Sequence, residues 1–199
     1  MSAQPLPRLS PEEYLAIERA AEFRSEYYDG AMYAMSGASH PHNVINVNLV
    51  RELSSALRKR GCFVVSSDAR LRVSPGRVYT YPDIMAGCDQ PKFADDQKDT
   101  LLNPALVIEV LSPSTEAHDR GYKFAQYRQL DSIREYVLVS QSEPRVERFE
   151  RQADGRWVLS EHVGMDAVCR FESVDCDVPL ADIYENVAFG ERQPASPVT

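Results

Sequence analysis

The sequence predicts an α/β (α+β) fold in which helices flank one mixed central sheet. Predicted helices and strands follow the order αββαβββαβ, and the later segments alternate as antiparallel strands do. Residues 105–111 form a run that is apolar apart from Glu109 and is typical of a central strand. The chain has 199 residues, 43% of them hydrophobic, which suffices for one core. We expect a single domain over residues 1–190 and a flexible tail over residues 191–199.

The N-terminal part of the chain predicts two helices around a hairpin. A capping box over residues 10–13 predicts a helix that runs to about Ala21. Residues 25–35 have the pattern of a hairpin with Asp29-Gly30 as its turn. Residues 39–60 carry apolar side chains at helical spacing, with a glycine directly after them, and predict the longest helix.

The middle of the chain predicts strands and one long loop. Residues 62–65 and 69–73 are expected to be strands, and residues 78–85 a further strand that ends near a Pro-Asp pair. Residues 88–103 are polar and aperiodic, which indicates a loop that is either functional or mobile. The central strand at residues 105–111 comes directly after this loop.

The rest of the chain predicts a helix and an antiparallel meander. One helix should span residue 115 to about residue 130, and a strand should follow at residues 135–139. Residues 145–151 alternate strictly, and another strand should begin at residue 157 after an Asp-Gly turn. Residues 181–187 are expected to form a short closing helix.

Composition narrows the function. The net charge of −8 argues against a protein that coats nucleic acid generally, because phosphate contacts must come from Lys and Arg. A local basic rim around an acidic site would still suffice for a nuclease. The alternative is that the Lys and Arg side chains of such a rim simply lie on solvated faces of the protein. Three groups are candidates for such a rim: Arg58-Lys59-Arg60, Arg70/Arg72/Arg77 and Arg120/Lys123/Arg128.

The cysteines and the apolar windows bear on the compartment. Four cysteines are scattered without a CxxC pair, so we expect reduced, partly buried thiols: Cys62, Cys88, Cys169 and Cys176. The N-terminus lacks an apolar signal core, and no apolar window has the length of a membrane span. A cytoplasmic protein without a membrane partner is therefore expected.

Two acidic residues and a lysine form the main candidate site. Asp83 follows a proline at the end of one predicted strand, and Glu109 interrupts the apolar run of another. A carboxylate in a buried strand is costly unless something pairs with it. Asp119, Lys123 and Tyr127 are spaced four apart and share one helix face, which would lie over the sheet. The alternative is that Asp83 is only a turn residue and that Asp119 and Lys123 form an ordinary salt bridge on their helix.

At these residues the chain resembles the Uma-two family of restriction-endonuclease-like proteins, a branch of the PD-(D/E)XK nuclease superfamily. The resemblance covers roughly residues 9–140. It is carried by the order and spacing of several short segments: residues 26–30 with 35–39, His42 and Asn43, residues 81–84, residues 103–115, Asp119-Arg120, Lys123, Tyr127 and Glu135-Tyr136.

The resemblance implies a restriction-endonuclease-like mixed sheet with a metal site. Asp83 and Glu109 would bind Mg²⁺ or Mn²⁺ together with the main-chain carbonyl of Val110. The superfamily pattern places a lysine two residues after the glutamate, where this chain has Leu111, so Lys123 would supply the ammonium instead. Glu26 would be a further acidic ligand or base. Tyr127 and His42 are auxiliary candidates that could equally be packing or hydrogen-bonding residues.

Together these features predict a metal-dependent endonuclease that hydrolyses DNA phosphodiester bonds. The alternative is a nuclease-like fold that serves as a binding or assembly module with little catalysis, which the net charge of −8 favours. Hydrolysis of another phosphate ester is a third possibility, disfavoured by the lack of a Gly-rich phosphate cradle. The meander over residues 145–169 could extend the sheet or form a homodimer contact.

Overall fold

The computed structural model describes residues 8–74 and 76–189. The helical segments are α1 (Pro11–Ala20), α2 (His40–Leu57), α3 (Glu116–His118), the π-helical turn η1 (Asp119–Lys123), α4 (Phe124–Tyr127), the 3₁₀ turn η2 (Glu172–Val174) and α5 (Leu180–Ile183). The strands of the first half are β1 (Ser25–Tyr28), β2 (Ala31–Ala34), β3 (Phe63–Ser66), β4 (Arg70–Ser74), β5 (Val78–Thr80), β6 (Ile84–Gly87) and β7 (Thr100–Leu101). Those of the second half are β8 (Leu106–Leu111), β9 (Glu135–Ser140), β10 (Arg145–Arg151), β11 (Trp157–Val163), β12 (Val168–Phe171) and β13 (Cys176–Pro179).

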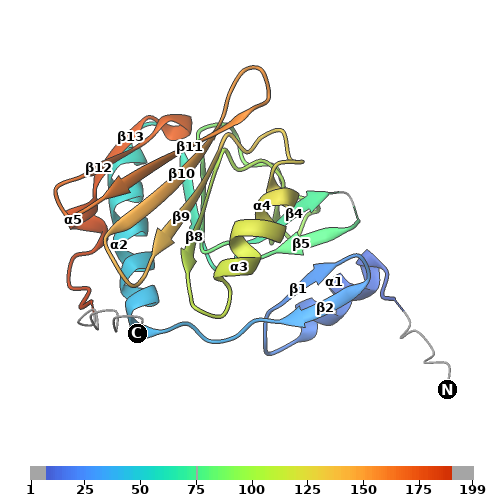
Figure 1. Cartoon of the computed structure of the whole chain (residues 1–199). Coiled ribbons are helices and arrows are strands. Elements are labelled where there is room, and N and C mark those ends of the chain that lie inside the picture. Colours follow the sequence, from blue (N-terminus) through green and yellow to red (C-terminus); the bar gives the residue numbers. More distant parts are fainter. Residues whose placement is uncertain (1–7, 75, 190–199) are drawn as a thin grey trace.

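The strands form two main sheets (Figure 1). The six-stranded sheet has the order β11-β10-β9-β8-β6-β3, and only β8 and β9 run parallel within it. The five-stranded sheet has the order β2-β1-β5-β4-β7, and β12 pairs with β13 in a separate hairpin. The predicted mixed sheet is thus present, with the C-terminal meander added to its edge through β10 and β11.

The strand expected over residues 78–85 is divided between the two sheets. β5 pairs in the five-stranded sheet and β6 in the six-stranded sheet, so the chain crosses from one to the other at residues 81–83. Pro82 has no N–H for a strand ladder, and the N–H of Tyr81 is donated to the side chain of Glu26 at 3.2 Å. The prediction of one continuous strand was therefore wrong, and the crossover places Asp83 where the two sheets meet.

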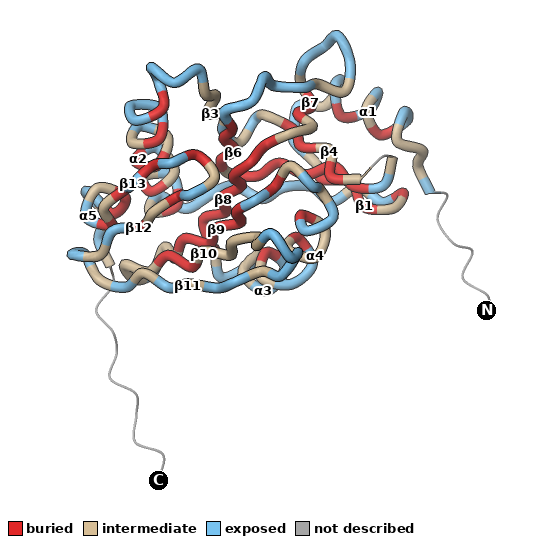
Figure 2. The backbone as a smooth tube through the Cα atoms, turned by 90° about the horizontal axis from the view of Figure 1, so that it is seen from above, coloured by how far each residue is buried: buried red, intermediate tan, exposed pale blue. Residues whose placement is uncertain are grey.

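Both faces of the six-stranded sheet are covered (Figure 2), and its strands β6, β8 and β9 are almost entirely buried. On one face the apolar side of α2 packs with the β12–β13 hairpin and α5. The other face packs against β4, β5 and α4. A smaller aromatic cluster of Tyr14, Tyr27 and Tyr79 joins α1 to the five-stranded sheet.

The predicted N-terminal elements are confirmed with small shifts of their ends. The Ser10–Glu13 capping box is formed on both sides, and α1 ends one residue earlier than expected. Asp29 and Gly30 form the hairpin turn with φ of 47° and 97°, as a two-residue turn between antiparallel strands requires. The longest helix is α2, which begins after an N-cap at Ser39 and ends three residues short of the predicted limit.

The long loop over residues 88–103 is tied to the body of the protein. Its strand β7 pairs parallel with β4. Arg19 of α1 holds the loop through ion pairs of 2.7 Å to Asp95 and 2.8 Å to Asp99. Two-residue strands carry almost no periodic signal, so β7 could not be found from the sequence.

Two of the cysteines contradict the prediction of reduced thiols. Cys62 and Cys88 form a disulfide, while Cys169 and Cys176 are free and buried. Phe63 pairs with Gly87 in antiparallel β3 and β6, which brings the adjacent Cys62 and Cys88 face to face. Strand register, which the spacing of the cysteines does not show, decides the pairing.

The C-terminal part also departs from expectation in detail. The closing helix begins at Leu180 and ends at Ile183, and the β12–β13 hairpin was not predicted. The tail over residues 191–199 lies outside the described residues. No helix among the described residues has both the length and the apolar character to cross a bilayer.

Candidate functional site

Glu109 lies in the middle of β8 and is 3% exposed. Its neighbours Ile108 and Val110 pack with α2 on one face of the sheet, while Val107 and Leu111 pack on the other. Alternation along the strand therefore points the Glu109 side chain toward the five-stranded sheet and α4, as the sequence predicted. The carboxylate sits in the seam between the two sheets.

Asp83 reaches the same seam from the crossover between β5 and β6. Its Oδ2 accepts a hydrogen bond of 2.8 Å from the N–H of Val110, and its own N–H donates to Oε2 of Glu109 at 3.4 Å. His42, near the start of α2, places Nε2 3.1 Å from the same Asp83 Oδ2. Burial lowers the pKa of His42, but the hydrogen bond and charge of Asp83 outweigh it, so the net pKa is raised.

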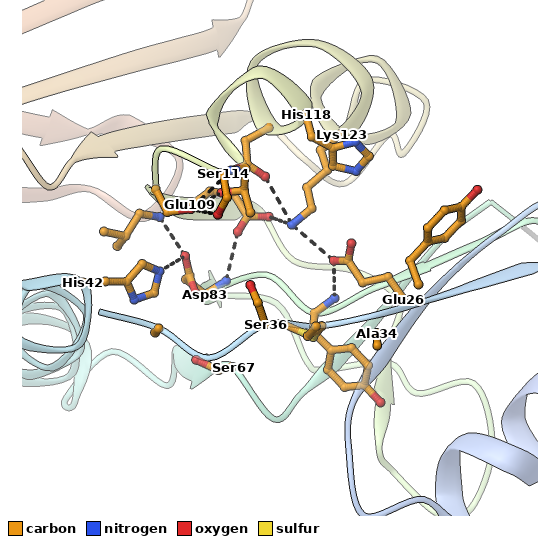
Figure 3. Close-up of a pocket in the computed structure, with 18 of the residues that line it drawn as sticks. Glu26, Ala34, Ser36, His42, Ser67, Asp83, Glu109, Ser114, His118 and Lys123 are labelled. Atoms are coloured by element: carbon orange, nitrogen blue, oxygen red, sulfur yellow. Dashed lines mark hydrogen bonds and ion pairs between the residues drawn. The ribbon is translucent and has the colours of Figure 1, made fainter. Parts of the chain in front are cut away.

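Lys123 connects the carboxylates (Figure 3). Its Nζ lies 3.1 Å from Glu109 Oε1, 3.2 Å from Glu26 Oε1 and 3.4 Å from Asp119 Oδ1. Burial alone would lower the pKa of Lys123, but Glu109 and the other negative groups raise it well above the ordinary value. The side chain is therefore a buried ammonium with three carboxylate neighbours, two from β-strands and one from its own helix.

The helix that carries Lys123 is not the uniform α-helix expected over residues 115–130. Its central part, Asp119–Lys123, is a π-helical turn between the short helices α3 and α4. Such turns hold one extra residue and are frequent at functional sites. Tyr127 follows in α4; its hydroxyl donates to Glu109 Oε1 at 2.9 Å and lies 3.2 Å from the hydroxyl of Thr80.

Negative charge exceeds positive charge at this place. We call Glu26, Asp83, Glu109 and Asp119 the carboxylate cluster. Burial raises the pKa of Glu109 to about 8; Lys123 opposes the rise, and the other three carboxylates add to it. Burial likewise raises the pKa of Asp119. One ammonium and one imidazole face four carboxyl groups, so the site is electrostatically incomplete without a further cation or protons.

The carboxylate cluster forms the floor of a pocket of about 1130 Å³. The segment between β2 and α2 lines one side, and the loop after β8 together with α3 and η1 lines the other. The pocket brings together six of the seven predicted site residues: Glu26, His42, Asp83, Glu109, Val110 and Lys123. Tyr127, the seventh, does not line the pocket; it is buried and donates a hydrogen bond to Glu109.

The sequence placed Asp119 on the same helix face as Lys123 but did not predict it as a site residue. In the structure it is buried, and among the described residues its Oδ1 accepts no hydrogen bond although Lys123 is within ion-pair distance. The signal in the sequence was that Asp119 stands four residues before Lys123, which places the two side chains on one helix face. Sequence reasoning missed Tyr28, His118 and Tyr122 of the pocket wall, which lie together only after folding.

Several of the arginines predicted to form a basic rim contact other residues of the protein instead. Arg70 is buried and donates to Tyr81 and Thr100, and Arg120 pairs with Glu116 and Glu147. Arg60 pairs with Asp175, and Arg77 pairs with Asp29. Among the described residues, Arg8 and Lys123 are the Arg and Lys side chains that line the pocket.

Known proteins resemble this chain in sequence over most of its length. Residues 11–174 match the model of the Uma2 family, described as "Putative restriction endonuclease". Two similar proteins come from Synechocystis sp. (strain ATCC 27184 / PCC 6803 / Kazusa). "Uncharacterized protein slr1290" is 37% identical over 187 residues, which is 93% of this chain and 96% of that protein. "Uncharacterized protein sll1609" is 36% identical over 163 residues, 82% of this chain and 92% of that protein.

A solved structure shares the fold. The crystal structure of "a putative nuclease belonging to DUF820" from Anabaena variabilis ATCC 29413 superposes with a TM-score of 0.72 at 18% sequence identity. The match covers 88% of this chain and 97% of that chain. The two proteins therefore share a fold over most of their length.

Proposed function

This chain belongs to the Uma2 family, and we propose from that premise that it is a metal-dependent endonuclease that hydrolyses DNA phosphodiester bonds. One observation carries the proposal: the half-buried carboxylate of Asp83 lies beside the buried carboxylate of Glu109, which pairs with the buried ammonium of Lys123 at the floor of a large pocket. A phosphodiester hydrolase of this type needs acidic oxygens for a divalent cation and a positive group near the phosphate.

The residues at the site fit a hard divalent cation. We propose that Asp83, Glu109 and the main-chain carbonyl of Val110 would hold Mg²⁺ or Mn²⁺, since all three offer oxygen ligands. Burial is the main cause of the raised pKa of Glu109, and the neighbouring carboxylates add to it, so a bound cation would favour the charged form of this carboxyl. Within the part of the chain that the structure describes, no three His, Cys, Asp or Glu side chains form a metal cluster by themselves. Waters and phosphate oxygens would therefore complete the shell, as is usual for Mg²⁺.

When bound, the ion would supply Lewis acidity at the scissile phosphate. Lys123 would hold its ammonium beside Glu109, where it can orient a nucleophile and offset the negative charge that develops during hydrolysis. Glu26, which contacts the same ammonium, would serve as a further acidic ligand or base. His42 and Tyr127 would act as positioning residues, because they hydrogen-bond the carboxylates of Asp83 and Glu109 respectively.

Nicking of supercoiled plasmid tests the proposal. The wild type should nick DNA with Mg²⁺ or Mn²⁺ but not with EDTA. Asp83→Asn, Glu109→Gln and Lys123→Ala should each slow nicking by about 100-fold, the typical cost of losing one group that stabilises transition-state charge. Glu161→Gln is the matched control, because Glu161 on β11 lies outside the pocket lining and pairs with Arg145 of β10. Equal nicking by all five proteins would refute the assignment.

A second candidate function is a binding or assembly module that keeps the nuclease fold with little catalysis. The net charge of −8 and the engagement of Arg60, Arg70, Arg77 and Arg120 in other contacts favour it. DNA binding that survives in EDTA, without nicking under any divalent cation, would select this function over the enzyme.

Three further expectations remain proposals. We propose that residues 1–190 form one domain, that the chain forms a homodimer, and that it is cytoplasmic. Light scattering coupled to gel filtration tests the dimer, and a monomer that nicks both strands would reject it. Limited proteolysis tests the domain, and cell fractionation tests the location.

A further inference from the structure

Aromatic side chains gather on one wall of the pocket, beside the carboxylate cluster. We call Tyr28, Tyr33, His118 and Tyr122 the aromatic wall; all four line the pocket. Tyr33 on β2 is 57% exposed, Tyr122 on η1 is 39% exposed, and His118 is exposed as well. Exposed aromatic rings that cluster at a cavity are unusual, since burial of the ring faces would otherwise be favourable.

The buried ring of Tyr28 supports the exposed ones. Its centroid lies 5.7 Å from that of Tyr33, 5.1 Å from that of Tyr122 and 5.6 Å from that of His118, each time edge to face. His118 and Tyr122 stack on one another at 5.4 Å. The rings are thereby held in fixed orientations, and aromatic pairs of this geometry add stability beyond their buried area.

A direct chain of contacts joins the aromatic wall to the carboxylate cluster. The hydroxyl of Tyr28 donates to Glu26 Oε2 at 2.7 Å, and Oε1 of the same glutamate lies 3.2 Å from Lys123 Nζ. His118 Nε2 lies 3.2 Å from the Tyr28 hydroxyl, and Figure 3 shows His118 and Lys123 on the same side of the pocket. A ligand that lies on the exposed rings therefore sits beside the acidic floor.

The charges around the pocket disfavour a ligand held mainly through phosphates. Among the described residues, two Lys or Arg side chains line the pocket, Arg8 and Lys123, and Lys123 already has three carboxylate neighbours. Affinity for duplex DNA rises with the number of phosphates that Lys and Arg neutralise. Single strands instead gain much of their affinity from bases stacked on aromatic side chains, which duplex DNA keeps inside its own stack.

We propose that the aromatic wall stacks the bases of single-stranded DNA, so that the substrate of this nuclease is a single strand or an unpaired segment of a duplex. The inference rests on the proposed function for the cleavage step, but base stacking on the wall can be measured without cleavage. The pocket volume of about 1130 Å³ exceeds that of an ordinary small-ligand site and suits more than one nucleotide.

A simpler explanation is that the four rings only hold β2 against the helix. The two explanations differ in whether the bases of a ligand matter. Stacking requires a base, so an abasic strand with the same phosphates should bind much more weakly. A structural role predicts equal binding of both strands and equal binding by variants that stay folded.

Fluorescence anisotropy with labelled strands of about 12 nucleotides provides the test, the length being within the range of single-strand sites. Binding is measured in Ca²⁺ to a single strand, the matching abasic strand and a duplex, and gel analysis verifies that each strand stays intact. Tyr33→Leu and Tyr122→Leu remove an aromatic face while keeping an apolar side chain. Phe23→Leu is the matched control, because Phe23 is 75% exposed and lies outside the pocket lining.

The wild type and Phe23→Leu should bind the single strand at least about fivefold more tightly than the abasic strand, and each tyrosine variant should lose at least about fivefold in affinity. Equal affinity for normal and abasic strands, tighter binding of the duplex, or tyrosine variants that match Phe23→Leu would overturn the inference. Base-dependent binding without any nicking would uphold the aromatic wall and reject the enzyme. Nicking that is equally fast in the wild type, Tyr33→Leu and Tyr122→Leu would uphold the enzyme and reject base stacking on the aromatic wall.

Discussion

Replacing Glu109 by Gln should stabilise the metal-free protein, and the gain should grow with pH. The substitution keeps the shape of the side chain and an oxygen for the hydroxyl of Tyr127, but removes the charge that burial disfavours. Burial raises the pKa of Glu109 from 4.5 to about 8. The native carboxyl therefore binds a proton more tightly than the unfolded one, and stability falls as pH rises between these two values.

The size of the effect can be worked out from the shift. Below pH 4.5 the carboxyl is protonated in both states and the wild type and Glu109→Gln should differ by a constant amount. Above that value the penalty in the wild type increases by about 1.4 kcal/mol per pH unit, to roughly 3 kcal/mol at pH 7. For a chain of 199 residues this corresponds to a difference in Tm of roughly 6–12 °C. Above pH 8 the difference should level off.

Thermal unfolding of both proteins in EDTA between pH 5 and pH 9 measures the difference, with Glu161→Gln as the control. Adding Mg²⁺ or Mn²⁺ should raise the Tm of the wild type and of Glu161→Gln but leave Glu109→Gln almost unchanged, because the cation replaces the missing positive charge. A difference in Tm that stays constant across this pH range would refute the electrostatic reasoning, whatever its absolute size.

Three other perturbations probe the described contacts. Lys123→Met should lower the free energy of unfolding by about 3–5 kcal/mol at pH 9 in urea titrations, because Glu109 is charged above its pKa of about 8 and would lose its buried ammonium partner; unchanged stability at pH 9 would contradict this ion pair. Arg148→Leu should cost a similar amount, about 3–5 kcal/mol, since Arg148 lies 2.9 Å from the fully buried Glu135; Arg156→Leu, on the exposed β10–β11 turn, should cost almost nothing in the same titration. Reducing the Cys62–Cys88 disulfide should lower stability by roughly 2–4 kcal/mol, given the separation of 26 residues; a reductant-independent Tm would contradict it.

Local signals in the sequence predicted much of the fold. The Asp29-Gly30 turn, the capping box at Ser10 and the apolar run of β8 each depend on residues close together in the chain. The inward direction of Glu109 was predictable for the same reason, because strand alternation fixes it once β8 is recognised. These features are confirmed with boundary shifts of one to three residues at α1 and α2.

Features that depend on distant residues were not predictable. Pro82 marks a break, but only pairing with β1 or β8 reveals that the break is a crossing between two sheets. Cys62 meets Cys88 through strand register, and Arg70 leaves the surface because Tyr81, Thr100 and Asp99 surround it. The aromatic wall likewise joins β1, β2 and the later helical segments, which lie far apart in the sequence.

The π-helical turn makes the placement of Lys123 a matter of residue count. Each residue of an α-helix advances the chain by about 100° around the axis, so the extra residue in a π-helical turn sets the direction of every side chain after it. Deleting Gly121, which lies inside this turn, would change the number of residues between Asp119 and Lys123 and so alter the direction of the Lys123 side chain relative to the carboxylate cluster. Insertions and deletions in this one turn would therefore uncouple the ammonium from the carboxylate cluster while every residue type at the site is retained.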